Sequence, residues 1–255
     1  MIDMDLLVVF FLVFVRITAF MMTAPFFEYR NIPGLPKIGL ALLLAGVIFP
    51  IVKTSGINVP GGVFGYSLAI IAEAGIGLML GLIASFIFHG IRMAGQFIDF
   101  QMGFAMATVF DPISGIQVTL IARFLNLLAI IFFLNMNGHY YLIESLVKSY
   151  DLVPLTAGAF RSATTLTVIK AFSGMFALAF QLSAPIMAVL VVIDLALGFV
   201  SRTVPQLNVF MLGFPVKIVV GILTLSAIVP LLGTLLQEVF KTMQNNMLLL
   251  LRGLT

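Results

Sequence analysis

The chain has 255 residues, of which 62% are hydrophobic and only 9% are charged, and its mean hydropathy is +1.21. A soluble domain of ordinary composition is far less apolar, so the composition indicates an integral membrane protein. The net charge of +3 comes from 13 basic residues spread thinly along the chain, without the clustered Lys/Arg stripe that nucleic-acid binding requires. Nucleic acid is therefore excluded as a partner. With no cysteine, disulfides and thiolate chemistry are excluded as well.

Apolar tracts separated by polar or proline-containing segments predict an all-α protein. They cover residues 5–22, 37–53, 63–110, 117–135, 163–200 and 214–252. The first tract lacks a basic region before it and a small-residue cleavage site after it, so we expect mature structure and not a signal peptide. Residues 26–37 and 138–162 should be loops or short amphipathic helices too small to fold alone. Pro50, Pro185 and Pro230 should kink or stop the helices that contain them. We expect one integral unit with no linker.

Three of these tracts contain more residues than one crossing of a bilayer needs. Residues 63–110 would reach about 72 Å as one helix at ~1.5 Å per residue, whereas a hydrocarbon core is roughly 30 Å thick. Residues 164–200 and 216–252 would each span about 55 Å. Either each tract breaks into two spans, with residues 90–95 as one hinge, or these are long helical hairpins packed largely against other protein. For the C-terminal pair we favour the hairpin, because each tract is short for two spans of ~20 residues plus a turn.

Six charged residues lie inside or at the margin of apolar tracts, namely Arg16, Glu73, Asp99, Arg123, Asp194 and Lys217. A charge in hydrocarbon costs at least ~2.5 kcal/mol, so such groups normally face protein or water. Four roles are open: snorkelling at helix ends, paired packing within the chain, a proton relay, and salt bridges between subunits. Glu73 lies deepest in its tract and is the hardest to explain by snorkelling. We predict that the six charges are buried or lie between subunits.

Small residues recur at every fourth position after Glu73, as Gly77, Gly81 and Ser85. Such a face lets helix backbones approach closely in a membrane, where hydrophobicity gives no drive for association. It serves either packing within this chain or contact with a neighbouring subunit.

The sequence contains no motif that would support an enzymatic activity. His89 and His139 lie far apart and have no cysteine beside them, so they do not form a usual zinc set. Gly75, Gly77 and Gly81 lie inside an apolar helix and lack the Gly-Lys-Ser/Thr ending of a phosphate loop. No serine has a plausible His and Asp arrangement. We expect no catalysis and no cofactor.

The most informative stretch is residues 102–142, where an apolar helix ends in a polar turn before the next apolar tract. A polar turn between two apolar helices is costly in lipid, because the freed backbone groups need partners there. Something other than lipid should surround it. The stretch contains the motifs Gly103-Phe104-Ala105-Met106-Ala107, Phe110-Asp111-Pro112-Ile113-Ser114-Gly115-Ile116-Gln117 and Asn137-Gly138-His139.

These motifs resemble the FliR family of bacterial flagellar type III export gates. Two further motifs carry the same resemblance, Arg202-Thr203-Val204-Pro205-Gln206-Leu207-Asn208-Val209-Phe210 and Gly213-Phe214-Pro215. The resemblance covers essentially the whole chain, in order. Injectisome (SctT-like) relatives share the architecture, but the Asp-Pro turn and the Asn-Gly-His sequence are more similar to the flagellar branch.

The resemblance implies a non-enzymatic pore subunit built of long kinked helical hairpins in a hetero-oligomeric helical assembly. In the family, one FliR chain joins several FliP and FliQ subunits in the bacterial inner membrane at the flagellar basal body, and FlhB associates with them. Unfolded flagellar proteins pass through the assembly, which also contacts membrane lipid. Residues 1–162 would be P-like hairpins, and residues 163–255 would be a Q-like hairpin.

The resemblance also implies a pore plug at about residues 106–117. Asp111 and Pro112 at turn positions i and i+1 would keep the loop compact. Methionine and phenylalanine side chains would offer a deformable apolar seal that excludes ions and yields to a passing chain. The predicted plug and its gasket comprise Met102, Phe104, Met106, Phe110, Asp111, Pro112, Ile113, Ser114, Gly115 and Ile116. The simpler interpretation is a hairpin core around an ordinary turn.

Two other functions stay open at this point. A proton-coupled small-solute transporter would use Glu73, Asp99 and Asp194 as a carboxylate relay and would act without partner subunits. The homologous injectisome export-gate subunit is the second alternative.

Overall fold

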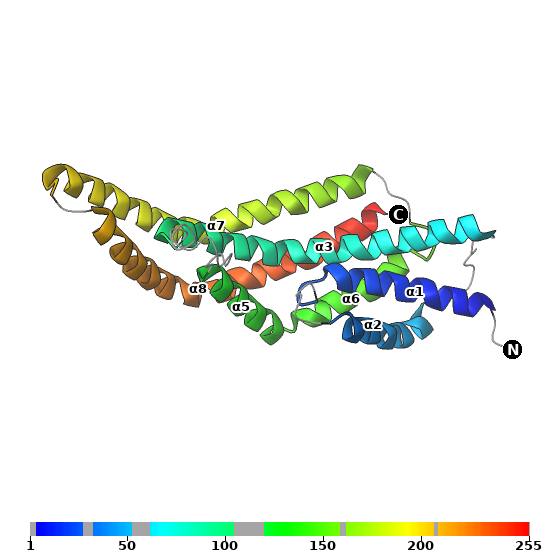
Figure 1. Ribbon diagram of the computed structural model, residues 1–255. Helices are drawn as coiled ribbons and strands as arrows, with labels where there is room; N and C mark the ends of the chain where they lie inside the picture. Colours follow the sequence, from blue (N-terminus) through cyan, green and yellow to red (C-terminus); the bar gives the residue numbers. More distant parts are fainter. Residues whose placement is uncertain are drawn as a thin grey trace. The chain divides into compact units, whose positions relative to one another are not determined.

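The computed structural model describes residues 4–27, 33–52, 62–104, 120–158, 162–206 and 209–254 (Figure 1). Every secondary-structure element within these ranges is helical. The elements are α1 (Met4–Thr23), α2 (Gly34–Ile48), the 3₁₀ turn η1 (Phe49–Ile51), α3 (Gly62–Met102), α5 (Leu120–Asn135), α6 (Gly138–Leu152), α7 (Ser162–Thr203) and α8 (Val209–Gly253). The all-α fold predicted from the sequence is confirmed.

Five of the described helices are long and apolar enough to cross a membrane. These candidate spans are Leu6–Thr23, Gly34–Ile51, Gly62–Met102, Ser162–Thr203 and Met211–Gly253. Helices α5 and α6 pass the same test only as a bent pair, which gives up to six spans among the described residues. A helix satisfies its own backbone polar groups and is therefore the form in which such tracts enter lipid. The chain is a multi-pass membrane protein.

The three longest tracts form unbroken helices. Helix α3 has 41 residues and runs through residues 90–95 without a break, so the alternative of a break there is wrong. Helices α7 and α8 have 42 and 45 residues and continue through Pro185 and Pro230, which stop neither helix. A proline removes one backbone hydrogen bond, and packing against neighbouring helices offsets that loss. Pro50 behaves as predicted, because α2 ends at Ile48 and Pro50 lies in η1.

Helix α6 occupies most of a segment for which the sequence left a loop or a short helix open. The break before it is made by Asn137, whose backbone is left-handed with φ +56°. Asparagine adopts this conformation more readily than most residues, and Gly138 follows it as the first residue of α6. The short-helix alternative is correct for residues 138–152.

The chain forms two compact units that share its three longest helices. Unit 1 comprises Met1–Ile87, Asn137–Ser173 and Phe240–Thr255, and unit 2 comprises Phe88–Met136 and Gly174–Val239. Helices α3, α7 and α8 each contribute one segment to each unit. The predicted division into P-like residues 1–162 and Q-like residues 163–255 concerns likeness to other subunits and stays a prediction.

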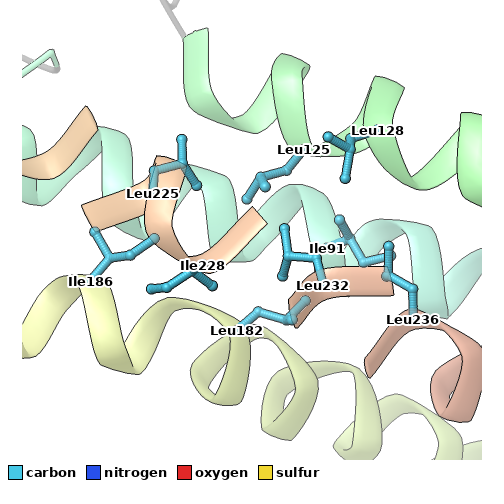
Figure 2. A pocket seen from close by; sticks show the side chains of 9 residues that line it. All are labelled: Ile91, Leu125, Leu128, Leu182, Ile186, Leu225, Ile228, Leu232 and Leu236. Atoms are coloured by element: carbon cyan, nitrogen blue, oxygen red, sulfur yellow. The ribbon is translucent and has the colours of Figure 1, made fainter. Parts of the chain in front are cut away.

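The interior of unit 2 is aliphatic where its four helices meet. Figure 2 shows a narrow cavity there whose lining contains only leucine and isoleucine side chains. They are Ile91 of α3, Leu125 and Leu128 of α5, Leu182 and Ile186 of α7, and Leu225, Ile228, Leu232 and Leu236 of α8. This lining offers a ligand no charge and no side-chain hydrogen bond, so we interpret the cavity as part of the core.

Candidate functional site

Most of the predicted plug lies outside the described residues. This holds for Met106, Phe110, Asp111, Pro112, Ile113, Ser114, Gly115 and Ile116. Met102 and Phe104 are described: Met102 ends α3 and is fully buried, and Phe104 is half-buried. The plug role stays a prediction. The candidate site therefore comprises the helix ends on either side of residues 105–119. These are the C-terminal end of α3 and the N-terminal end of α5, and both helix ends belong to unit 2.

Helix α3 ends in a Schellman motif at Gly103. The backbone N–H of Gly103 donates to Phe100 O at 3.1 Å, and the N–H of Phe104 donates to Asp99 O at 3.0 Å. Gly103 has φ +92°, a conformation that glycine adopts without strain. A Cβ added there would also lie 2.5 Å from Cε1 of Phe214 in α8. Only glycine meets both requirements at this position.

The carboxylate of Asp99 joins the end of α3 to the start of α5. One oxygen accepts a hydrogen bond from the N–H of Ile121 at 2.9 Å, and the other accepts one from the N–H of Ala122 at 3.0 Å. The first N–H groups of a helix have no partner within it, and the helix dipole favours a negative charge at this end. Asp99, only 4% exposed, therefore caps α5 from another helix.

Gly95, one turn before Asp99, allows the two helices to approach this closely. A Cβ at Gly95 would lie 2.6 Å from the backbone nitrogen of Ala122 and closer still to its Cα. Real Cβ atoms essentially never lie within 3.0 Å of another heavy atom. The backbones of α3 and α5 are thus in direct contact beside the Asp99 cap.

A second polar cluster joins the end of α3 to the α7–α8 hairpin. Gln101 Nε2 donates to Asp194 Oδ2 at 2.9 Å, and Lys217 forms an ion pair with Asp194 Oδ1. The side chains of Lys217 and Asp194 are 17% and 39% exposed. Met102 packs beside Gly221 of α8, where an added Cβ would lie 2.8 Å from the Met102 Cε. The last turn of α3 is therefore held on three sides, by α5, α7 and α8.

Unit 1 contains an ion pair that is completely buried. Arg16 Nε of α1 lies 2.5 Å from Glu73 Oε2 of α3, and both side chains are 0% exposed. The guanidinium also donates to Ser149 O at 3.0 Å and to Val153 O at 3.0 and 3.1 Å. Glu73 Oε1 accepts a hydrogen bond from the N–H of Thr156 at 3.1 Å. Both members of the pair are therefore satisfied by groups of the same chain.

Tyr150 completes this buried network. Its ring centroid lies 4.5 Å from Arg16 Cζ, close enough for a cation–π interaction. Its hydroxyl donates to Val13 O of α1 at 3.2 Å. The network ties α1, α3 and the C-terminal end of α6 into one block.

The small-residue face predicted on α3 packs against α1. A Cβ at Gly77 would lie 2.9 Å from Phe20 N, and one at Gly81 would lie 2.6 Å from Phe20 O. Ser85 is buried and donates to Leu82 O at 2.8 Å. Of the two alternatives for this face, the structure shows packing within the chain, where Gly77 and Gly81 contact α1.

The remaining charged residue of the predicted set, Arg123, lies exposed on α5 in this single chain. An inter-subunit role for it stays a prediction. Among the described residues, no group of three or more His, Cys, Asp or Glu side chains could hold a metal ion.

Sequence reasoning missed the partners of the buried charges. Gln101 could have been noticed, since it is a polar residue two positions from Asp99 in an apolar helix end. Val153 could not, because it acts through its backbone carbonyl group, which every residue carries. Ser149 accepts hydrogen bonds from Arg16 through both its carbonyl oxygen and its Oγ.

Comparison with known proteins identifies the family of this chain. The model for bacterial export proteins, family 1, matches residues 7–243 of the chain. The chain belongs to this family. The flagellar biosynthetic protein FliR of Bacillus subtilis (strain 168) is 40% identical over 250 residues, which cover 94% of this chain and 95% of that protein. The corresponding protein of Pectobacterium carotovorum subsp. carotovorum is 39% identical over 233 residues, covering 91% and 88%, respectively.

A third relative, the FliR protein of Escherichia coli (strain K12), is 34% identical over 230 residues, which cover 90% of this chain and 87% of that protein. The resemblance to the FliR family is confirmed, and it extends over nearly the full length of each relative. The chain is a membrane protein of the flagellar export apparatus.

Proposed function

We propose that this chain is a non-enzymatic subunit of the flagellar type III protein export gate, where it helps to form and close the channel for unfolded flagellar proteins. The observation that carries this function is the family match over residues 7–243, together with flagellar relatives aligned over most of their length. A match of this extent includes at least part of every described helix, so the assignment does not depend on one shared motif.

The helix lengths support a place within an assembly. At ~1.5 Å per residue, α8 with its 45 residues would extend over more than twice the roughly 30 Å of a hydrocarbon core. Large apolar side chains nevertheless stay exposed along the long helices, among them Phe64 of α3 and Phe199 of α7. Lipid covers only part of such helices, and other protein subunits would cover the rest.

The partners we propose follow the family resemblance. FliP and FliQ would surround the chain, with residues 1–162 in P-like positions and residues 163–255 in a Q-like position, and FlhB would associate with them. Exported flagellar proteins would pass through the assembly transiently. The assembly would lie in the inner membrane at the flagellar basal body.

Co-purification tests this assembly against the transporter alternative. A tagged chain extracted from its native membrane should come out as a hetero-oligomer containing FliP-like and FliQ-like subunits. A lone monomer or homodimer would instead favour a transporter. The contacts of the carboxylates support the gate, because Glu73, Asp99 and Asp194 each bind structural partners.

The plug is tested by deleting residues 110–116. We expect membranes that carry the assembled gate to become leaky to small ions, because the deletion removes the apolar seal. A replacement of the same residues by glycine and serine keeps the loop length and separates the effect of length from that of the side chains. Ion leak at the wild-type level with assembly intact would show that the plug role is wrong.

A further inference from the structure

We propose that the exposed face of α5 binds an α-helix of a neighbouring gate subunit, and that this partner helix places a carboxylate opposite Arg123. The inference rests on the proposed function, because it requires a hetero-oligomer, and it adds the surface and the chemistry of one contact within that assembly. The whole surface lies on one described helix of unit 2.

The large apolar side chains exposed on α5 all lie on one face of the helix. They are Leu120, Phe124, Leu127, Ile131 and Leu134, which are 42–65% exposed, and we call them the exposed seam. Their spacing alternates between four and three residues, as the a and d positions of a heptad do. A second helix can pack along such a face over its whole length.

The opposite face of α5 is already covered by this chain. Its buried residues are Ile121, Ala122, Leu125, Asn126, Ala129 and Phe133. Figure 2 shows the side chains of Leu125 and Leu128 at the cavity that α5 shares with α3, α7 and α8. The exposed seam therefore points away from the interior of unit 2 and contributes nothing to its core.

Arg123 distinguishes this face from an ordinary lipid-facing surface. It is exposed, and it lies three positions after Leu120 and four before Leu127, so it borders the exposed seam. A charge that faces hydrocarbon is costly. Arg123 is also the fourth residue of α5, and the helix dipole disfavours a cation in the first turn. An anion beside Arg123 would relieve both costs.

No described carboxylate of unit 2 supplies this anion. Asp99 caps the start of α5, and Asp194 binds Lys217. Glu238 has an interaction of its own. Within the described ranges, Arg123 makes no hydrogen bond or ion pair. The described part of the chain therefore leaves the charge of Arg123 uncompensated.

A carboxylate on a partner helix satisfies the charge and the exposed seam together. When the seam occupies the a and d positions, Arg123 occupies position g, from which side chains form salt bridges with a facing helix. A guanidinium can bind both oxygens of one carboxylate, which fixes the register of the two helices. A lipid phosphate would satisfy the charge alone, and the tests below distinguish these two anions.

Carbodiimide cross-linking of Arg123→Lys tests the contact in the purified gate. The reagent joins a lysine amine to a carboxylate in direct contact and does not couple arginine, so the wild type is the matched control. Arg123→Lys should form a covalent product of this chain with one other subunit that is absent from wild type. Mass spectrometry should locate the bond between position 123 and an Asp or Glu of that subunit.

Assembly is the second readout, measured as the amount of other subunits recovered with equal amounts of tagged chain. Arg123→Lys keeps the charge and should recover nearly as much as wild type. Arg123→Leu should recover about tenfold less, because it leaves the partner carboxylate desolvated without its cation. Arg123→Glu should recover less still, since like charges would then face each other. If lipid faces this helix, Arg123→Leu should assemble as well as wild type.

Two results would overturn the inference. One is a cross-link at position 123 that is absent or forms only within this chain, and the other is full assembly of Arg123→Leu. A wild-type chain that purifies as a lone monomer or homodimer would instead contradict the proposed function. If the hetero-oligomer forms and either overturning result is found, the proposed function stands and this contact is wrong.

Discussion

Replacement of Glu73 by leucine should destabilise the chain by about 3 kcal/mol. Removing one partner of a buried ion pair leaves the other charge uncompensated, at a cost of roughly 3–5 kcal/mol. Arg16 would still donate to the carbonyl groups of Ser149 and Val153, which favours the lower end of that range. At ~1.4 kcal/mol per tenfold, the ratio of folded to unfolded chain would fall more than 100-fold.

A double-mutant cycle isolates the contribution of the pair. Arg16→Met leaves Glu73 without its cation and should cost a similar amount. The double variant Arg16→Met, Glu73→Leu removes both charges and fills the space with apolar groups, so it should be less destabilised than the sum of the single variants by at least ~2 kcal/mol. The assay is SDS-driven unfolding of the purified gate, followed by a fluorophore on a cysteine introduced at an exposed position of this chain.

Two outcomes would refute this reasoning about the pair. One is a loss of less than about 1 kcal/mol in the free energy of unfolding of Glu73→Leu, because that magnitude is typical of exposed ion pairs. The other is a double variant that loses the full sum of the single effects, because independent sites add.

Two smaller perturbations follow from other contacts of the chain. Gly77→Ala should lower the yield of assembled gate, because its Cβ would lie 2.9 Å from Phe20 N, whereas Gly46→Ala has nothing within 4 Å of the new Cβ and should match wild type in the same co-purification. Lys217→Glu should place like charges together at Asp194 and weaken swimming motility on soft agar. The double variant Asp194→Lys, Lys217→Glu restores opposite charges and should recover most of it; equal defects in the single and double variants would contradict the pairing.

The class of the protein and most of its helices could be predicted because they depend on local composition. A long apolar tract has to form a helix in lipid wherever its neighbours lie. Pro185 and Pro230 do not stop their helices, since a helix held by neighbours over many turns tolerates one missing hydrogen bond; a kink at these prolines stays a prediction.

The charged residues of the site could be picked out from the sequence, but their partners could not. Arg16 and Glu73 are 57 positions apart, and their pairing depends on how α1 and α3 pack, which an apolar pattern does not specify. The plug residues were named from motifs, and most of them lie outside the described residues, so their role rests on the family resemblance and on the experiments above.

Two of the buried charges of this chain act as caps supplied from a distance. Arg16 brings a positive charge to the carbonyl groups of Ser149 and Val153 at the C-terminal end of α6. Asp99 brings a negative charge to the N–H groups at the start of α5. Each sign matches the dipole of the helix end that it serves. A short helix that ends within a membrane protein leaves up to four backbone groups without partners, and lipid supplies none. The buried charges therefore explain how α5 begins and how α6 ends within the protein, since each charge satisfies backbone groups that the helix itself leaves without partners.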